Sequence, residues 1–239
     1  MAILFLWIMA KIQVKIRGKR KVWSMRFISS LMAHILAFFH DSVGVSWGMA
    51  IIFLTIFVKV ILFPLTLSQI RSMEGMKKIQ PEMKKIQEKY KNNPEEQQRR
   101  LLELYQKNNV NPLGGCLPLL IQLPILWALF QVLRFPENYN IDFSNAYFLT
   151  MDLTQSNSYW LLAVISGLTS FIQQRMTTVS TADASQNTML YVMPILIGFM
   201  TYTLKAGIGI YWVASTVLGI VQQWFITKFF LREKQPELK

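Results

Sequence analysis

Lys59 is the residue in this sequence that is best suited to chemistry in the sense of charge recognition, because it lies inside an otherwise apolar run. That run, VSWGMAIIFLTIFVKVILFPLTL, covers residues 45–67 and holds no other charged side chain. A lysine at the middle of a membrane span costs about 2.5–3.5 kcal/mol on insertion scales. Lys59 lies about eight residues, or roughly 12 Å, from the cytoplasmic end expected for this span. Either its stem reaches the membrane surface, or its ammonium group faces a water-filled cavity and attracts an anion.

Polar side chains in the other apolar runs favour the cavity. Thr55 precedes Lys59 by four residues and shares its helical face. The other runs contribute Gln122, Gln173, Ser215, Thr216, Gln222 and Gln223. Such groups face lipid only at a cost, so they either line one groove with Lys59 or hydrogen-bond between helices. No Asp or Glu lies in these runs, and the anion must therefore come from a substrate or partner.

Other kinds of chemistry find little support. The single cysteine, Cys116, excludes an intrachain disulfide, and two histidines, His34 and His40, do not make a cysteine–histidine metal set. The sequence contains no GxxxxGK[ST] phosphate loop. We therefore expect no enzyme activity, no metal and no cofactor.

The composition indicates a membrane protein. Hydrophobic residues make up 52% of the 239 residues and charged residues only 16%, whereas a soluble domain is nearer one quarter charged. A net charge of +12 is also typical of nucleic-acid binding, but in a chain with membrane spans it favours a cytoplasmic excess of Lys and Arg. We expect no nucleic-acid substrate.

The apolar runs that must position Lys59 predict an all-α integral membrane protein with five transmembrane helices. These are residues 45–67, 112–133, 159–174, 188–204 and 208–230. Between and beside them the sequence predicts an amphipathic helix on the outer surface at 25–44, a cytoplasmic helical hairpin at 68–111, an external loop at 134–158, a cytoplasmic loop at 175–187 and a cytoplasmic tail at 231–239. An ordinary half-buried helix is the alternative for residues 25–44.

The hairpin is the only long polar stretch. By our count residues 68–111 hold ten Lys or Arg and six Glu, which places the hairpin in the cytoplasm by the positive-inside rule. A sparse apolar stripe runs along its first helix and consists of Met73, Met76, Ile79, Met83, Ile86 and Tyr90. Asn93 is the expected N-cap of the second helix, with Pro94 at its first position and Glu95 and Glu96 in its first turn.

Residues 1–24 do not fit this scheme. Met1 to Ala10 is apolar but too short to cross a bilayer, which needs about 20 residues. Basic residues follow the apolar part, whereas a signal peptide places them first. The segment is a truncated span, a membrane-surface segment or a junction left by cloning. Its basic run comes before the first predicted span and so falls on the outside, against the positive-inside rule.

Five stretches resemble the YidC membrane protein insertases, a bacterial family related to the mitochondrial and chloroplast insertases. The signature-like stretch is NPLGGCLPLLIQLP at residues 111–124. The supporting stretches are FPLTLSQIRSM (63–73), IQPEMKKIQEKY (79–90), FIQQRM (171–176) and GIYWVASTVLGIVQQW (209–224). The resemblance covers roughly residues 25–230, and the order of spans and loops agrees.

The resemblance implies a fold and a set of site residues. The expected fold has five transmembrane helices around a hydrophilic groove that opens to the cytoplasm and to lipid. The basic residue in the family's first core span is usually arginine, and Lys59 stands at the matching position. This exchange keeps the charge but loses the bidentate fork of arginine. Positions that contact substrate in the family correspond to Thr55, Tyr211 and Trp212, and a groove glutamine corresponds to Gln173.

The implied function is insertion and folding of client membrane proteins without nucleotide, alone or with the Sec translocon. The expected location is the bacterial cytoplasmic (inner) membrane, and the expected partners are client proteins, the lipid bilayer, the Sec translocon and the ribosome. A small anion transporter or channel with Lys59 as its anion site is the alternative, although five spans without visible repeats speak against most transporter designs. A purely structural assembly scaffold is a third interpretation. Relatives with a large periplasmic domain or a lipoprotein signal suggest that residues 1–24 are a remnant or a truncated N-terminal region.

Overall fold

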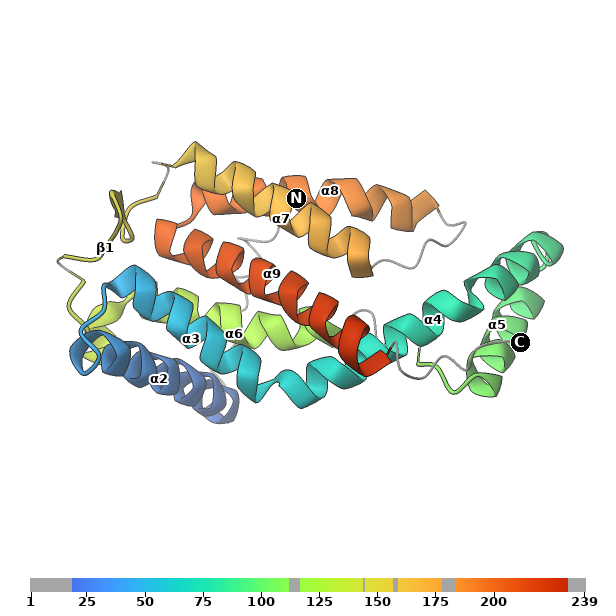
Figure 1. The fold of residues 1–239 in the computed structure, drawn as a ribbon, viewed down its shortest axis with the longest axis horizontal. Coiled ribbons are helices and arrows are strands. Elements are labelled where there is room, and N and C mark those ends of the chain that lie inside the picture. Colours follow the sequence, from blue (N-terminus) through green and yellow to red (C-terminus); the bar gives the residue numbers. More distant parts are fainter. Residues whose placement is uncertain (1–18, 112–116, 144, 157–158, 178–183, 232–239) are drawn as a thin grey trace.

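The chain folds into a helical bundle with a projecting helical hairpin (Figure 1). The computed structural model describes residues 19–111, 117–143, 145–156, 159–177 and 184–231. The predictions for residues 1–18, for most of the tail and for part of the loop at 175–187 lie outside this range. The described helices are α2 (Lys19–Asp41), α3 (Trp47–Ile61), α4 (Phe63–Lys89), α5 (Pro94–Lys107), α6 (Leu117–Arg134), η2 (Pro136–Tyr139), α7 (Trp160–Thr177), α8 (Ala184–Thr203), α9 (Ala206–Ile226) and η3 (Thr227–Leu231).

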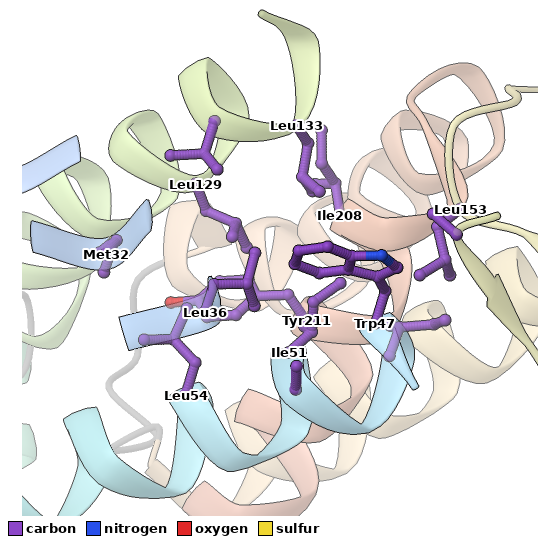
Figure 2. Packing of buried hydrophobic residues seen from close by; sticks show 14 of the residues in the cluster. Met32, Leu36, Trp47, Ile51, Leu54, Leu129, Leu133, Leu153, Ile208 and Tyr211 are labelled. Atoms are coloured by element: carbon purple, nitrogen blue, oxygen red, sulfur yellow. The ribbon is translucent and has the colours of Figure 1, made fainter. Parts of the chain in front are cut away.

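Helix α9 is the central element of the bundle (Figure 1). It packs against α7 and α8 on one side and against α3 and α6 on the other, while α2 covers α3 and α6. The buried core joins α2, α3, α6 and α9 through fully buried side chains such as Leu36, Ile51, Leu54 and Leu129 (Figure 2). The end of the bundle near Trp47 and Leu133 is therefore a firm frame against which the rest of α9 is positioned.

The loop after α6 contributes to this frame. Ile141, Phe143, Ala146 and Leu153 are buried in the main core, and strands β1 (Tyr147–Phe148) and β2 (Met151–Asp152) form a small antiparallel hairpin. The sequence predicted only a polar loop here, because two-residue strands leave no period long enough to recognise. The packed loop covers the end of the bundle that lies opposite the α4–α5 hairpin (Figure 1).

Helix α2 has two apolar sides. Met32, Ala33 and Leu36 are buried against the bundle, while Phe27 and Phe38 expose 69% and 57% of their surface. The helix is thus half-buried on one side and presents large apolar groups on another. This combination suits a helix that packs on a membrane protein and also touches lipid.

The first predicted span is bent and is not one straight helix. Helix α3 stops at Ile61, and α4 begins at Phe63 after a bend of 66°. Pro64 lies in the first turn of α4. It has no N–H to donate to the carbonyl of Val60, and its ring would clash with that carbonyl in a continuous helix. The structure therefore places Lys59 in the last turn of α3, just before the bend.

Helices α7 and α8 approach each other closely through small residues. A Cβ atom on Gly167 would lie 3.2 Å from the carbonyl oxygen of Pro194, and one on Gly198 would lie 3.1 Å from that of Ala163. Glycines at such crossings let helix backbones touch, which is how many membrane helices associate. The pair α7–α8 consequently forms one wall of the bundle.

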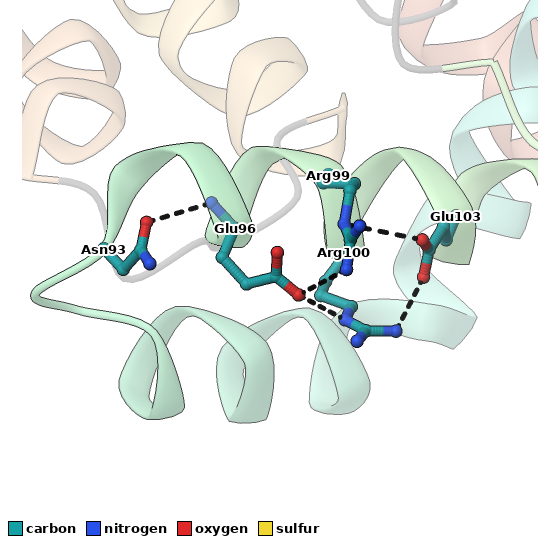
Figure 3. Close-up of polar contacts among 5 residues, drawn as sticks. All are labelled: Asn93, Glu96, Arg99, Arg100 and Glu103. Atoms are coloured by element: carbon teal, nitrogen blue, oxygen red, sulfur yellow. Dashed lines mark hydrogen bonds and ion pairs between the residues drawn. The ribbon is translucent and has the colours of Figure 1, made fainter.

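The α4–α5 hairpin has a core of its own. Ile79 and Met83 of α4 pack against Leu104 of α5, as the apolar stripe predicts. Asn93 caps α5, since its side-chain oxygen accepts from the N–H of Glu96 at 3.2 Å, and this predicted cap is confirmed (Figure 3). Glu96 also binds Arg99 and Arg100 at 2.8 and 2.9 Å. The hydrogen bond from Arg99 lowers the pKa of Glu96.

Length and hydropathy identify few membrane spans among the described residues. One continuous segment, Ala206–Leu231, is long and apolar enough to cross a membrane, and the bent pair α3–α4 passes the same test together. Shorter apolar helices occupy Ile121–Arg134 and Leu190–Thr203. Helix α7 carries Ser166, Thr169, Ser170 and Gln173, and these polar residues lower its hydropathy.

Candidate functional site

Polar groups of α7 and α9 meet along a line that we call the polar seam, which also includes the backbone carbonyl of Met176 and the space at Gly219. It consists of Thr169, Ser170, Gln173 and Met176 from α7 and of Trp212, Thr216, Gly219 and Gln223 from α9. The indole N–H of Trp212 donates to Ser170 Oγ at 3.0 Å, and the hydroxyl groups of Thr216 and Thr169 lie 3.1 Å apart. The amide of Gln223 donates to the carbonyl oxygen of Met176 at 3.1 Å.

The spacing of these pairs follows from two parallel helices. The seam residues of α9 recur every three or four positions, so they lie on one face of the helix. Their partners on α7 follow in the same order along the chain, from Ser170 opposite Trp212 to Met176 opposite Gln223. Helix α8 returns the chain between them (Figure 1), which is why α7 and α9 run the same way.

Lys59 reaches the seam from α3 at the level of Gly219. A Cβ atom on Gly219 would collide with the amide nitrogen of Gln173 and would lie 3.4 Å from Lys59 Nζ. The missing side chain of Gly219 therefore makes the space that the ends of Lys59 and Gln173 occupy. Gly219 was not singled out in the sequence, because a glycine in an apolar helix carries no signal about its neighbours.

Lys59 stands apart from the paired seam residues. Its side chain is half-buried, and within the described part of the chain no carboxylate lies within salt-bridge distance of Nζ. The C-terminal turn of α3 does favour a cation, because the last carbonyl groups of a helix carry partial negative charge. The geometry thus brings a cation to the seam and leaves it able to attract an anion from outside the protein.

Three of the predicted site residues are engaged within the protein. Thr55 is buried, and its hydroxyl group donates to the carbonyl oxygen of Ile51 at 2.7 Å. Tyr211 is buried in the main core with 2% of its surface exposed (Figure 2), and Gln122 donates to its hydroxyl group at 2.7 Å. Gln122 and Tyr211 thereby join α6 to α9, a common role of polar groups in membranes, whereas the hydrogen bond of Thr55 stays within α3.

The structure therefore divides the predicted site. Lys59 and Gln173 meet at Gly219, and Trp212 lies further along the same seam. Gln122 and Tyr211 form a separate contact between α6 and α9. The partners Thr169 and Ser170 were missed, although their three- to four-residue spacing with Gln173 on one helix is visible in the sequence.

Comparison of the chain with known proteins identifies the family to which it belongs. The family model described as 60Kd inner membrane protein matches residues 38–234. A membrane protein insertase YidC of Fusobacterium nucleatum is 42% identical over 209 residues, which cover 85% of this chain and 98% of that protein. The chain belongs to the YidC insertase family. This is a family of multi-pass inner-membrane proteins and not of enzymes, and its members act on client membrane proteins.

YidC relatives differ in how much of their length this chain represents. The insertase of Caldanaerobacter subterraneus is 38% identical and is covered to 96%. That of Geobacter sulfurreducens is 41% identical, but the chain spans only 36% of it. The crystal structure titled as an active YidC insertase with its first transmembrane domain resolved matches with a TM-score of 0.66 at 30% identity, over 91% of this chain and 50% of that one. The helical insertase fold is thereby confirmed.

Proposed function

We propose that this insertase receives the polar outer segment of a client protein at Lys59 and along the polar seam. The observation that carries the proposal is the convergence of Lys59 and Gln173 over Gly219, with no acidic partner for Lys59 among the described residues. An acidic client segment supplies the missing anion. The client's apolar span then moves sideways into lipid, driven by its own transfer free energy.

The seam supports this proposal because its half-buried members Thr169, Gln173 and Trp212 offer polar groups within an apolar bundle, whereas Ser170, Thr216 and Gln223 are buried. A client's polar residues lose less hydration free energy beside hydroxyl and amide groups than in hydrocarbon. Trp212 remains half-exposed beside Ser170 and can contact a client. Thr55, Gln122 and Tyr211 act in this proposal as positioning residues, because Thr55 and Tyr211 are buried and Gln122 is bonded to Tyr211. The Sec translocon and the ribosome belong to the proposal as further partners.

The first test replaces Lys59 by Ala, Glu and Arg and measures insertion of clients with acidic and with neutral outer segments. Unit charges about 8 Å apart attract by roughly 2 kcal/mol at an effective dielectric constant of about 20, which corresponds to about thirtyfold in a rate or affinity. We expect Arg to retain insertion, Ala to slow it for acidic clients by up to this factor, and Glu to slow it further. Neutral clients should change little.

Two controls make this test decisive. Lys84→Glu changes the charge equally on the exposed surface of the hairpin and should leave insertion unchanged. Photocrosslinkers at Gln173 and Trp212 should capture a nascent client, whereas one at Val164 on the outer side of α7 should not. If Lys59→Ala and Lys59→Glu insert acidic clients as fast as the parent, the electrostatic role is wrong. Flux of small anions through client-free liposomes would favour a channel instead.

A further inference from the structure

A basic cavity lies where the hairpin meets the ends of α7 and α9. Its volume is about 1020 Å³, large enough for a small-molecule ligand. Its walls come from α4, from the end of α7 and from α9 with η3. The basic side chains in these walls are Arg71, Lys77, Lys78, Arg175 and Lys228, and the one acidic side chain is Glu74.

Most of this positive charge is uncompensated by the residues that the structure describes. Glu74 binds Lys77 at 2.8 Å, and Lys77 also donates to the carbonyl oxygen of Met176 at 2.8 Å. The remaining four cations, which are Arg71, Lys78, Arg175 and Lys228, form no ion pair with any residue in the described ranges. Lys77 therefore links α4 to the end of α7, while the other four cations remain available for an anionic ligand.

One wall of the same cavity is apolar and aromatic. Trp224 and Phe230 line it and expose 53% and 40% of their surfaces, and Lys228 lies 4.8 Å from the centre of the Trp224 ring. Phe225 and Phe229 pack beside them. Aromatic residues gather at the end of a membrane helix where the headgroup region begins. The cavity thus joins cations to an apolar wall at the level of the lipid headgroups.

We propose that this cavity binds the phosphate headgroup of an anionic phospholipid. The four uncompensated cations contact the phosphate oxygens, and the acyl chains run along the aromatic wall into the bilayer. Basic pockets between membrane helices on the cytoplasmic side suit such headgroups. An acidic peptide uses the cations but has no need of the aromatic wall, and a free phosphate ion uses neither the wall nor the volume. The bound lipid would join α4 to the ends of α7 and α9, and this role is independent of Lys59.

The test measures lipid binding to the full chain purified in a neutral detergent. Phosphatidylglycerol and phosphatidylcholine are titrated, and retained lipid is counted by native mass spectrometry. We expect phosphatidylglycerol to bind preferentially. Replacing Arg71, Lys78, Arg175 and Lys228 together by Gln should weaken its binding at least about tenfold. The matched control replaces Lys84, Lys85, Lys89 and Lys91 by Gln, which removes the same charge from exposed or hairpin-tip positions outside the cavity, and it should bind as the parent does.

Three results would overturn the proposal. The first is equal retention of phosphatidylglycerol and phosphatidylcholine by the parent, and the second is an equal loss in both fourfold variants, which indicates unspecific attraction. The third is cavity-dependent binding of inorganic phosphate or of an Asp/Glu-rich peptide without any preference for the anionic lipid. Melting temperatures of both variants in lipid-free detergent show that each is folded. If Arg71 and Arg175 are replaced by Lys and not by Gln in the fourfold cavity variant, the preference for the anionic lipid should be restored.

Discussion

The surroundings of Lys59 explain how a charged residue is accommodated in this bundle. It lies in the last turn of α3, where the helix dipole favours a cation by about 0.3–1 kcal/mol. Gly219 leaves space for its ammonium group beside Gln173. Both features reduce the cost of the charge without neutralising it. At the residue scale, the site therefore depends on the charge of Lys59 and on the absence of a side chain at Gly219.

Tyr211 and Gln122 show the opposite situation, a polar pair used for packing. Tyr211→Phe removes the hydroxyl group that accepts from Gln122 and leaves the Gln122 amide without that partner inside the bundle. We expect a loss of about 0.5–1.5 kcal/mol in stability, seen as a lower melting temperature in detergent. Tyr202→Phe removes a hydroxyl group from an exposed residue of α8 and should have little effect. Equal melting temperatures for Tyr211→Phe and the parent would contradict this packing role.

At the scale of elements, small residues decide how closely helices approach the site. Gly167 and Gly198 bring α7 and α8 into backbone contact, and this contact fixes α7 as one side of the seam. Gly219 acts differently, because the group it faces is the flexible end of Gln173 and not backbone. A side chain at position 219 can therefore be accommodated, but only if Gln173 moves.

Gly219→Ala separates stability from function at this site. Alanine is about 1 kcal/mol better than glycine in a helix, and the amide of Gln173 can move aside. We expect a melting temperature equal to or above that of the parent, together with slower insertion of acidic clients. The matched control Val217→Ala changes an exposed position of the same helix and should insert normally. Normal insertion by Gly219→Ala would show that the space at Gly219 is not needed.

At the scale of the whole molecule, the bend between α3 and α4 sets the direction of the hairpin. The first half of the bent pair belongs to the bundle and the second half leads to the hairpin and the basic cavity (Figure 1). Lys59 lies just before this bend and is brought to the seam by the packing of α3 on α9. Pro64 thus affects the orientation of the hairpin.

Pro64→Ala tests this link. Alanine restores the missing N–H and removes the clash with Val60, so α3 and α4 should straighten. We expect a changed distance between spin labels at Leu102 on α5 and Val164 on α7, measured by pulsed electron paramagnetic resonance in a Cys116→Ser background. Pro136→Ala, in the loop at the other end of the bundle, should leave this distance unchanged. The same distance in Pro64→Ala would mean that side-chain packing alone holds the bend.

Much of the architecture is predictable because its signals are local. The hairpin stripe, the Asn93 cap with Pro94, and the apolar runs each depend on residues close in sequence. The family follows from stretches such as NPLGGCLPLLIQLP and is confirmed by the comparisons. The small β-hairpin and the buried loop were not predictable, because they pack on α3, for example Phe143 on Trp47, and α3 is distant in sequence.

The sequence by itself determined that Lys59 is a charge in an apolar run and that polar residues on other helices accompany it. Only the tertiary structure decided which of these residues meet: Gln173 lies beside Lys59, whereas Gln122 binds Tyr211 in the core. The physical reason is geometric. Hydropathy and periodicity describe one helix at a time, but a contact between helices depends on their rotation, their offset along the axis and the bend at Pro64. These quantities are fixed by packing of the whole bundle.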